Sequence, residues 1–174
     1  MKTLFVAIRA LLYSTGFVLL WAWLARGARR YDAGLGIELP SGSQALGLVL
    51  AVPGALLVLA CVGSFIFRGR GTPAPFDPPV LFVPTGPYRY VRNPMYIGAA
   101  LVLGGYAFSQ RSASVVLLTA GFLLIMHLFV ILLEEPGLEE RFGDSYVRYK
   151  RSVNRWLPRI PPEGVPDAKL PGPS

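Results

Sequence analysis

Long apolar segments, separated by short polar ones, dominate the hydrophobic pattern of this chain. Four of them are candidate membrane spans: Leu4–Ala25, Leu46–Phe67, Pro94–Gln110 and Ser112–Leu133. About 20 helical residues cross a hydrocarbon core of roughly 30 Å. Three segments reach that length, whereas Pro94–Gln110 barely does, so we expect it to pack tightly against its neighbours or to tilt very little. The pattern predicts an all-α fold, a polytopic membrane bundle of about four spans.

Composition supports a lipid environment. Hydrophobic residues make up 53% of the 174 residues and charged residues only 16%, against about 25% charged residues in a typical soluble domain. Basic residues exceed acidic ones, 17 to 10. They lie at the ends of the apolar segments and form no stripe, so we expect anionic lipid headgroups as their partners and not nucleic acid.

The basic residues also predict the orientation. With the N-terminus in the cytoplasm, 12 of the 17 fall on that side and 4 on the other, with Arg9 inside a span. The positive-inside rule therefore puts both termini in the cytoplasm, and we expect a multi-pass protein of a bacterial inner membrane. The first segment could instead be a cleaved signal peptide, with Ala25–Ala28 near the cleavage site, but its apolar stretch is long for that role.

Two regions outside the spans have ordered patterns. Gly71–Pro94 holds seven of the sixteen prolines, which predicts a stiff, non-helical loop. Leu138–Trp156 has apolar residues at helical spacing with charges between them, which predicts an amphipathic helix. We divide the chain into a transmembrane hairpin (residues 1–70), a catalytic core (71–158) and a disordered, proline-rich tail (159–174).

Three clusters carry candidate chemistry, because polar side chains in or beside hydrocarbon are costly. The segment Gly86–Gly98 brings two arginines, an amide and three tyrosines to the start of the third span, as an interfacial belt or as a binding site. Glu134 and Glu135 end the fourth span, where acids oppose the helix dipole and need a partner. A structural ion pair with the loop arginines and recognition of a cationic ligand both explain them.

His127 lies seven residues before Glu134, so a regular helix would project both from one face. A hydrogen bond to a neighbouring helix is the commoner role for such a histidine. Cys61 is the only cysteine, which excludes an intrachain disulfide, and it suits a small buried apolar side chain. We expect no metal site.

Five spaced elements follow one another along the chain: Gly71–Pro73, Gly86–Gly98, Glu134–Glu135, Phe142–Tyr149 and Leu157–Pro158. Together they resemble the isoprenylcysteine carboxyl methyltransferase family, part of a wider group of membrane methyltransferases that includes phospholipid methyltransferases. The resemblance implies an enzyme that binds S-adenosyl-L-methionine without a Rossmann fold and releases S-adenosylhomocysteine. The sequence indeed lacks a Gly-rich turn between a strand and a helix.

The resemblance also implies which residues form the site. The cofactor-binding residues would be Leu81, Phe82, Val83, Tyr88, Asn93, Pro94, Met95, Tyr96 and Glu134. Glu134 would bind the cofactor's ammonium group, and Arg92, Asn93 and Glu134 are the candidate catalytic residues. From its charge alone, Arg92 is a counter-charge for carboxylates.

Two positions depart from the family pattern. Asn93 stands where the family has a histidine, so this position can hydrogen-bond but cannot titrate. Val130 stands where the eukaryotic enzymes have an arginine associated with the prenylcysteine substrate. A prenylated protein carboxylate is therefore in doubt as the acceptor, and a lipid-like or small hydrophobic carboxylate or thiol is favoured over a phospholipid amine.

Two other functions remain open on the sequence. A membrane reductase of the sterol-reductase type shares a similar loop and acidic pair but binds NADPH and has more spans. A non-enzymatic membrane scaffold would use the three clusters as interfacial anchors. Binding of S-adenosylhomocysteine, of NADPH or of neither distinguishes the three.

Overall fold

The computed structural model describes residues 2–69 and 84–160 of the chain. The helices are α1 (Lys2–Ala28), α2 (Asp32–Leu35), α3 (Ser43–Ser64), α4 (Pro94–Ser109), α5 (Ala113–Phe129), α6 (Glu135–Phe142) and α7 (Asp144–Ser152). Short turns join them: 3₁₀ turns η1 (Arg29–Tyr31) and η3 (Gly86–Arg89), and π-helical turns η2 (Phe65–Gly69) and η4 (Val130–Glu134). No strand is assigned in the described ranges, which confirms the all-α prediction.

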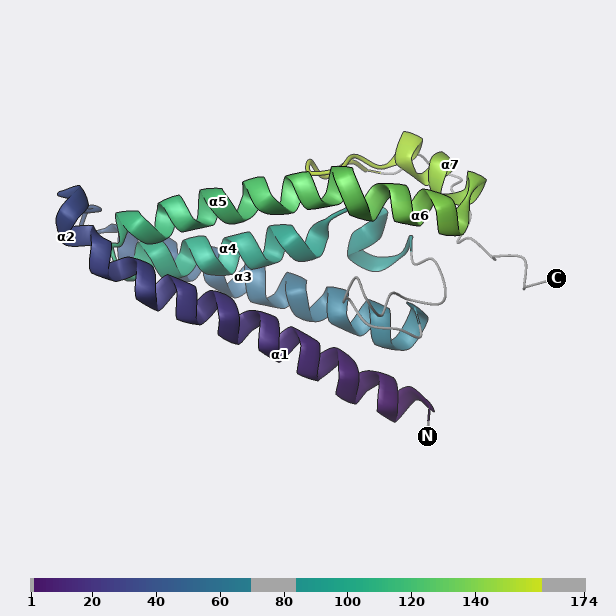
Figure 1. Ribbon diagram of the computed structural model, residues 1–174, viewed down its shortest axis with the longest axis horizontal. Coiled ribbons are helices and arrows are strands. Elements are labelled where there is room, and N and C mark those ends of the chain that lie inside the picture. Colours follow the sequence, from purple (N-terminus) through teal and green to yellow (C-terminus); the bar gives the residue numbers. More distant parts are fainter. Residues whose placement is uncertain (1, 70–83, 161–174) are drawn as a thin grey trace.

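Three helical stretches are long and apolar enough to cross a membrane: residues 4–35, 43–67 and 113–142. The fourth, α4, has 16 residues and so spans only about 24 Å. It packs against α3 on one side and α5 on the other (Figure 1). The structure confirms that this short helix is tightly packed between its neighbours.

Glycines let α3 and α4 pack with their backbones in contact. Gly47 and Gly54 of α3 face Gly105 and Gly98 of α4, respectively. A Cβ atom added to Gly105 would lie 2.6 Å from the carbonyl oxygen of Gly47, and one added to Gly98 would lie 2.8 Å from that of Gly54. In a membrane, where the hydrophobic effect does not drive helix association, such close approach supplies the dispersion contacts that hold helices together.

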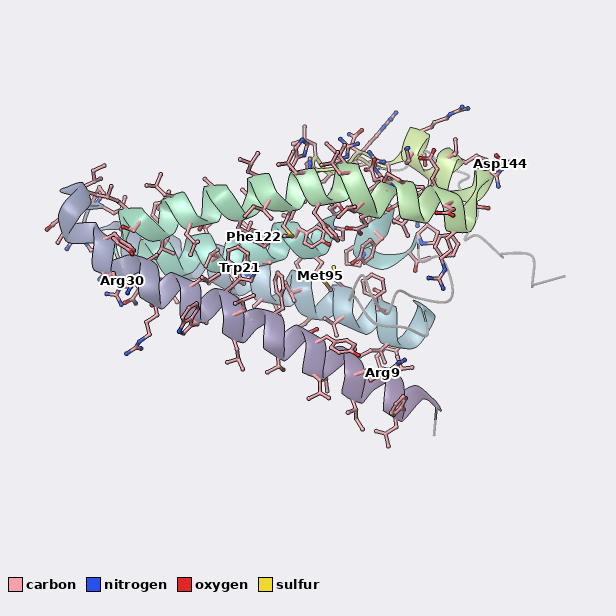
Figure 2. All side chains as sticks on the ribbon, in the orientation of Figure 1. Arg9, Trp21, Arg30, Met95, Phe122 and Asp144 are labelled. Carbon is pink, nitrogen blue, oxygen red and sulfur yellow. The ribbon has the colours of Figure 1, made fainter. Side chains whose placement is uncertain are left out.

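The helix α1 packs more loosely, along α4 and α5. Trp21 of α1 and Phe122 of α5 point toward one another (Figure 2), with ring centroids 4.8 Å apart in an edge-on arrangement. Ala25 is buried beside them. Much of the rest of α1 exposes large apolar side chains, as expected of a helix whose outer face meets lipid.

The end of the bundle that carries α2 is fastened by polar contacts. Asp32 accepts a hydrogen bond from the backbone nitrogen of Ser114 in the first turn of α5, at 2.9 Å. The Arg111 side chain donates to the carbonyl oxygen of Leu39 at 2.8 Å and pairs with Glu38 at 3.3 Å. These contacts connect the chain between α1 and α3 to the turn between α4 and α5.

The start of α1, the end of α3, the start of α4 and helices α6 and α7 all lie toward the opposite end of the bundle, where α1 diverges from α6 and α7 (Figure 1). This is the arrangement that the charge pattern requires, although the side of the membrane on which this end lies stays a prediction. The proposed domain boundaries also stay predictions. The extensive packing of α3 on α4 crosses the boundary at residue 70.

Two predictions about the segments at this end need correction. The amphipathic segment Leu138–Trp156 is helical only as far as Ser152, and it belongs to two helices, because Gly143, with φ of 52°, interrupts the helix between α6 and α7. The loop predicted to be non-helical contains the 3₁₀ turn η3, because Pro87 has a φ suited to a helical first turn. Residues 71–83 of that loop and residues 161–174 of the predicted tail lie outside the described residues.

Candidate active site

A π-helical turn, η4, lies between α5 and α6 and ends at Glu134, the first acid of the Glu134–Glu135 pair. The helix does not end after Leu133 but continues through η4 into α6, so the expected conflict with the helix dipole does not arise. A π turn inserts about one extra residue into a helix. The regular helical spacing from which His127 and Glu134 were expected to share a face therefore does not hold across η4.

Glu135 is the buried, neutralised acid. Arg155 donates to its two carboxylate oxygens at 2.8 and 2.9 Å, and Nη1 of Arg92 lies 3.1 Å from Oε1. Only 8% of the Glu135 side chain and 10% of the Arg92 side chain are exposed. For this acid the structural ion pair is therefore the correct interpretation.

Glu134 has a different environment. It is half-buried and faces α4, where the Tyr96 hydroxyl donates to its Oε2 at 2.9 Å. Among the described residues no basic side chain pairs with it. A carboxylate shielded from water without a cation is costly, so Glu134 is suited to accept a positively charged group from a ligand.

Arg92 retains unused hydrogen-bonding capacity. Its Nε and Nη1 atoms are buried and have no hydrogen-bond partner in the described part of the chain, although Nη1 lies beside Glu135. An arginine presents five N–H donors and cannot lose its charge. Arg92 therefore fits an anionic group in addition to Glu135. Glu134 and Arg92 together offer one carboxylate and one guanidinium for a zwitterionic ligand.

Asn93 and Pro94 fix the start of α4. Both are buried, and the Asn93 side-chain nitrogen donates to the carbonyl oxygen of Arg155 at 3.2 Å. Pro94 occupies the first helical turn, where a proline is well tolerated. Met95 and Tyr96 follow, half-buried, and Figure 2 marks Met95 at this end of α4. Leu81, Phe82 and Val83 lie outside the described residues.

The tyrosines near the site retain their protons. Burial raises the pKa of Tyr88 well above its usual value, and the nearby Cys61 and Glu134 raise it further. Burial likewise raises the pKa values of Tyr146 and Tyr149. The Tyr149 hydroxyl donates to the carbonyl oxygen of Tyr88 at 2.6 Å. These phenols can donate hydrogen bonds near neutral pH but do not serve as bases.

The segment Val153–Arg159, which we call the C-terminal clasp, crosses this end of the bundle. The Arg92 backbone nitrogen donates to the carbonyl oxygen of Asn154 at 2.9 Å, and that of Arg159 donates to Tyr90 at 2.8 Å. The Trp156 indole donates to Nδ1 of His127 at 2.9 Å. The clasp thus connects α4, α5 and α6, and its bond to His127 replaces the predicted bond between two helices.

Sequence reasoning did not identify Arg155 and Trp156 as part of the site. In the sequence, Arg155 is one of the basic residues that predict the orientation. The hydrogen bond between the Arg155 guanidinium and Glu135 raises the pKa of Arg155, so its charge is fixed. The available signal was the position of both residues just before Leu157–Pro158, the last element of the family pattern.

A family model decides the classification. The model described as phospholipid methyltransferase matches residues 43–145, from the start of α3 into α7. The chain belongs to this family. It is thus a member of the membrane methyltransferase superfamily that the sequence resemblance indicated, and the match includes Arg92, Tyr96 and both acids of the pair.

Two relatives are similar to this chain. An uncharacterized protein of Haemophilus influenzae is 38% identical over 63 residues, which is 36% of this chain and all of that protein. Methanethiol S-methyltransferase 1 of Bradyrhizobium diazoefficiens is 34% identical over 98 residues, which is 56% of this chain but only 31% of that enzyme. No solved structure matches the chain.

Proposed function

We propose that this protein is an integral membrane methyltransferase that uses S-adenosyl-L-methionine, with a lipid-like or small hydrophobic carboxylate or thiol as the acceptor. The observation that carries the proposal is that the two adjacent acids, Glu134 and Glu135, have different partners. Glu135 is neutralised by two arginines, whereas Glu134 has only the Tyr96 hydroxyl as a polar partner among the described residues. A carboxylate in this environment is suited to the ammonium of an amino-acid group.

The described residues fit the amino-acid part of the cofactor. The Glu134 carboxylate would hold the ammonium, and the unfilled donors of Arg92 would hold the carboxylate. Tyr96 orients Glu134 through its hydrogen bond. Tyr88, Asn93, Pro94 and Met95 would complete the wall of the site, together with residues 81–83.

When bound, S-adenosyl-L-methionine supplies a methyl group activated by a sulfonium sulfur. Transfer by in-line displacement requires mainly that acceptor and methyl group are held in line, so positioning can supply most of the acceleration. The ion pairs of Glu135 with Arg92 and Arg155 connect α6 to the segment before α4 and to the C-terminal clasp. A site at one end of a membrane bundle can also admit a hydrophobic acceptor from the bilayer.

We infer the acceptor class from the absence of an available general base among the described residues of the site. Glu135 is neutralised, the tyrosines keep their protons, and Nδ1 of His127 accepts from Trp156. A protonated lipid amine needs a base to remove its proton, whereas a carboxylate is already ionised near neutral pH and a thiol reacts through the fraction present as thiolate. The similarity to a methanethiol S-methyltransferase supports a thiol as one such acceptor.

This proposal predicts a pH profile determined by the acceptor. With a carboxylate, which stays ionised, kcat should be flat between about pH 6 and 8. With thiols, the rate should rise about tenfold per pH unit below the thiol's own pKa and level off above it, because only the thiolate attacks. Initial rates with a carboxylate and two thiols of different acidity test this. One inflection near pH 7 shared by every acceptor would contradict it and indicate a base on the protein.

We also propose that the termini and the site face the cytoplasm of a bacterial inner membrane, where the cofactor is available. The support is the predicted excess of basic residues on this side. A cysteine placed at residue 75 in a Cys61→Ala background should react with impermeant reagent from the cytoplasmic face. Reaction from the outer face alone would reverse the orientation.

Cofactor binding tests the proposed function itself. Purified protein in nanodiscs should bind S-adenosylhomocysteine in a calorimetric titration and should not bind NADPH. Binding of NADPH alone would favour a membrane reductase. Binding of neither would favour a non-enzymatic scaffold.

A further inference from the structure

The C-terminal clasp reaches the residues of the proposed cofactor site with its backbone and with its side chains. Its backbone accepts hydrogen bonds from the Arg92 main chain and the Asn93 side chain. Its Arg155 side chain donates hydrogen bonds to both carboxylate oxygens of Glu135, the neighbour of Glu134. A segment that only closed the bundle would not need a charged group at this point.

Charge balance explains what Arg155 does there. Glu134, Glu135, Arg92 and Arg155 together carry no net charge at this end of the bundle. Arg155 forms a two-nitrogen pair with Glu135, whereas Arg92 places only its Nη1 beside that acid, at 3.1 Å, and its buried Nε has no hydrogen-bond partner among the described residues. Without Arg155, Glu135 would draw the Arg92 guanidinium into the two-nitrogen arrangement that carboxylates favour.

We propose that Arg155 is a positioning residue of the cofactor site. By neutralising Glu135 it leaves the Arg92 donors available for the carboxylate of the cofactor, and it leaves Glu134 as the acid for the ammonium. The inference rests on the proposed function, because it assumes that the ligand has an amino-acid group. It assigns a role to a residue that would touch neither cofactor nor acceptor.

The first test compares two ligands that share the thioadenosine part. One carries the amino-acid group on its sulfur, and the other carries a methyl group there instead. S-adenosylhomocysteine carries the amino-acid group, whereas 5′-methylthioadenosine does not. We expect Arg155→Ala to weaken S-adenosylhomocysteine binding about tenfold, which corresponds to the loss of one hydrogen bond to a charged group. Binding of 5′-methylthioadenosine should not change. A general distortion of the site would weaken both ligands equally.

The second test is rescue by a second substitution. Glu135→Gln removes the charge that Arg155 neutralises, so Arg155→Ala/Glu135→Gln should bind S-adenosylhomocysteine within about threefold of the parent. Such non-additivity is expected when two residues act through one interaction. Arg151→Ala, which removes an exposed positive charge from α7, is the matched control and should leave both ligands unaffected.

The outcomes separate the two proposals. A parent chain that does not bind S-adenosylhomocysteine contradicts the proposed function. If the parent binds S-adenosylhomocysteine, three results would contradict the positioning role alone. They are an Arg155→Ala variant with unchanged affinity, one with equal losses of affinity for both ligands, and one whose affinity Glu135→Gln does not restore. If Arg155→Ala does not fold, Arg155→Lys carries the test, because a lysine keeps the charge but cannot form the two-nitrogen pair. It should lose about threefold for S-adenosylhomocysteine and nothing for 5′-methylthioadenosine.

Discussion

Substituting the two adjacent acids should have opposite effects on binding and stability. Glu134→Gln should weaken S-adenosylhomocysteine binding about tenfold or more, because a hydrogen bond to a charged group contributes roughly 1.5–3 kcal/mol. Its unfolding should change little, because Gln can still accept from Tyr96. Glu135→Gln should bind the ligand with nearly parental affinity but lose about 3 kcal/mol of stability, because it leaves buried Arg92 without its counter-charge.

Calorimetric titration and denaturant unfolding of the same samples measure both effects. Glu140→Gln is the matched control, because Glu140 is an exposed acid on α6 and its substitution should change neither quantity. Equal and small effects of Glu134→Gln and Glu135→Gln on binding would mean that both acids are structural. A larger binding loss for Glu135→Gln would reverse their assignment.

A single added methyl group should separate α3 from α4. Gly105→Ala places a Cβ 2.6 Å from the carbonyl oxygen of Gly47 and 2.7 Å from the backbone nitrogen of Ala51. Backbone atoms cannot rotate away as a flexible side chain can, so the helices must move apart. We expect a loss of about 1–3 kcal/mol in the free energy of unfolding, typical of overpacking.

The neighbouring glycine provides the control for this prediction. A Cβ on Gly104 meets only Cγ2 of Thr119, at 3.8 Å, and alanine is the better helix former by about 1 kcal/mol. Gly104→Ala should therefore be neutral or stabilising in thermal unfolding followed by circular dichroism. Similar melting of the two variants would show that the close contact between α3 and α4 does not limit stability.

Much of the fold could be predicted because hydrocarbon restricts the chain so strongly. Apolar length alone located the three long helices, and the short segment from Pro94 was correctly expected to be tightly packed. The break at Gly143 was missed because apolar spacing continues across it. A glycine within a helical pattern does not by itself reveal a positive φ.

The sequence identified several residues of the site but not how they are arranged. The family resemblance pointed to Glu134 and Glu135 as a pair, but no sequence signal reveals that they have different partners or that a π turn ends at Glu134. Arg155 lies 20 residues after Glu135, and only the folding back of the clasp brings them together. The number of basic residues could not reveal which of them neutralises an acid.

The central claim is methyl transfer from S-adenosyl-L-methionine, and one measurement tests it most directly. Purified protein in nanodiscs would be incubated with methyl-labelled S-adenosyl-L-methionine, a total lipid extract, and hydrophobic carboxylates and thiols, and the labelled product would be identified. We expect label on a carboxylate oxygen or a thiol sulfur, and at least tenfold less of it with Glu134→Gln at limiting cofactor. Label on a phospholipid amine would contradict the acceptor class. The absence of any labelled product, although S-adenosylhomocysteine binds, would contradict the proposed enzyme.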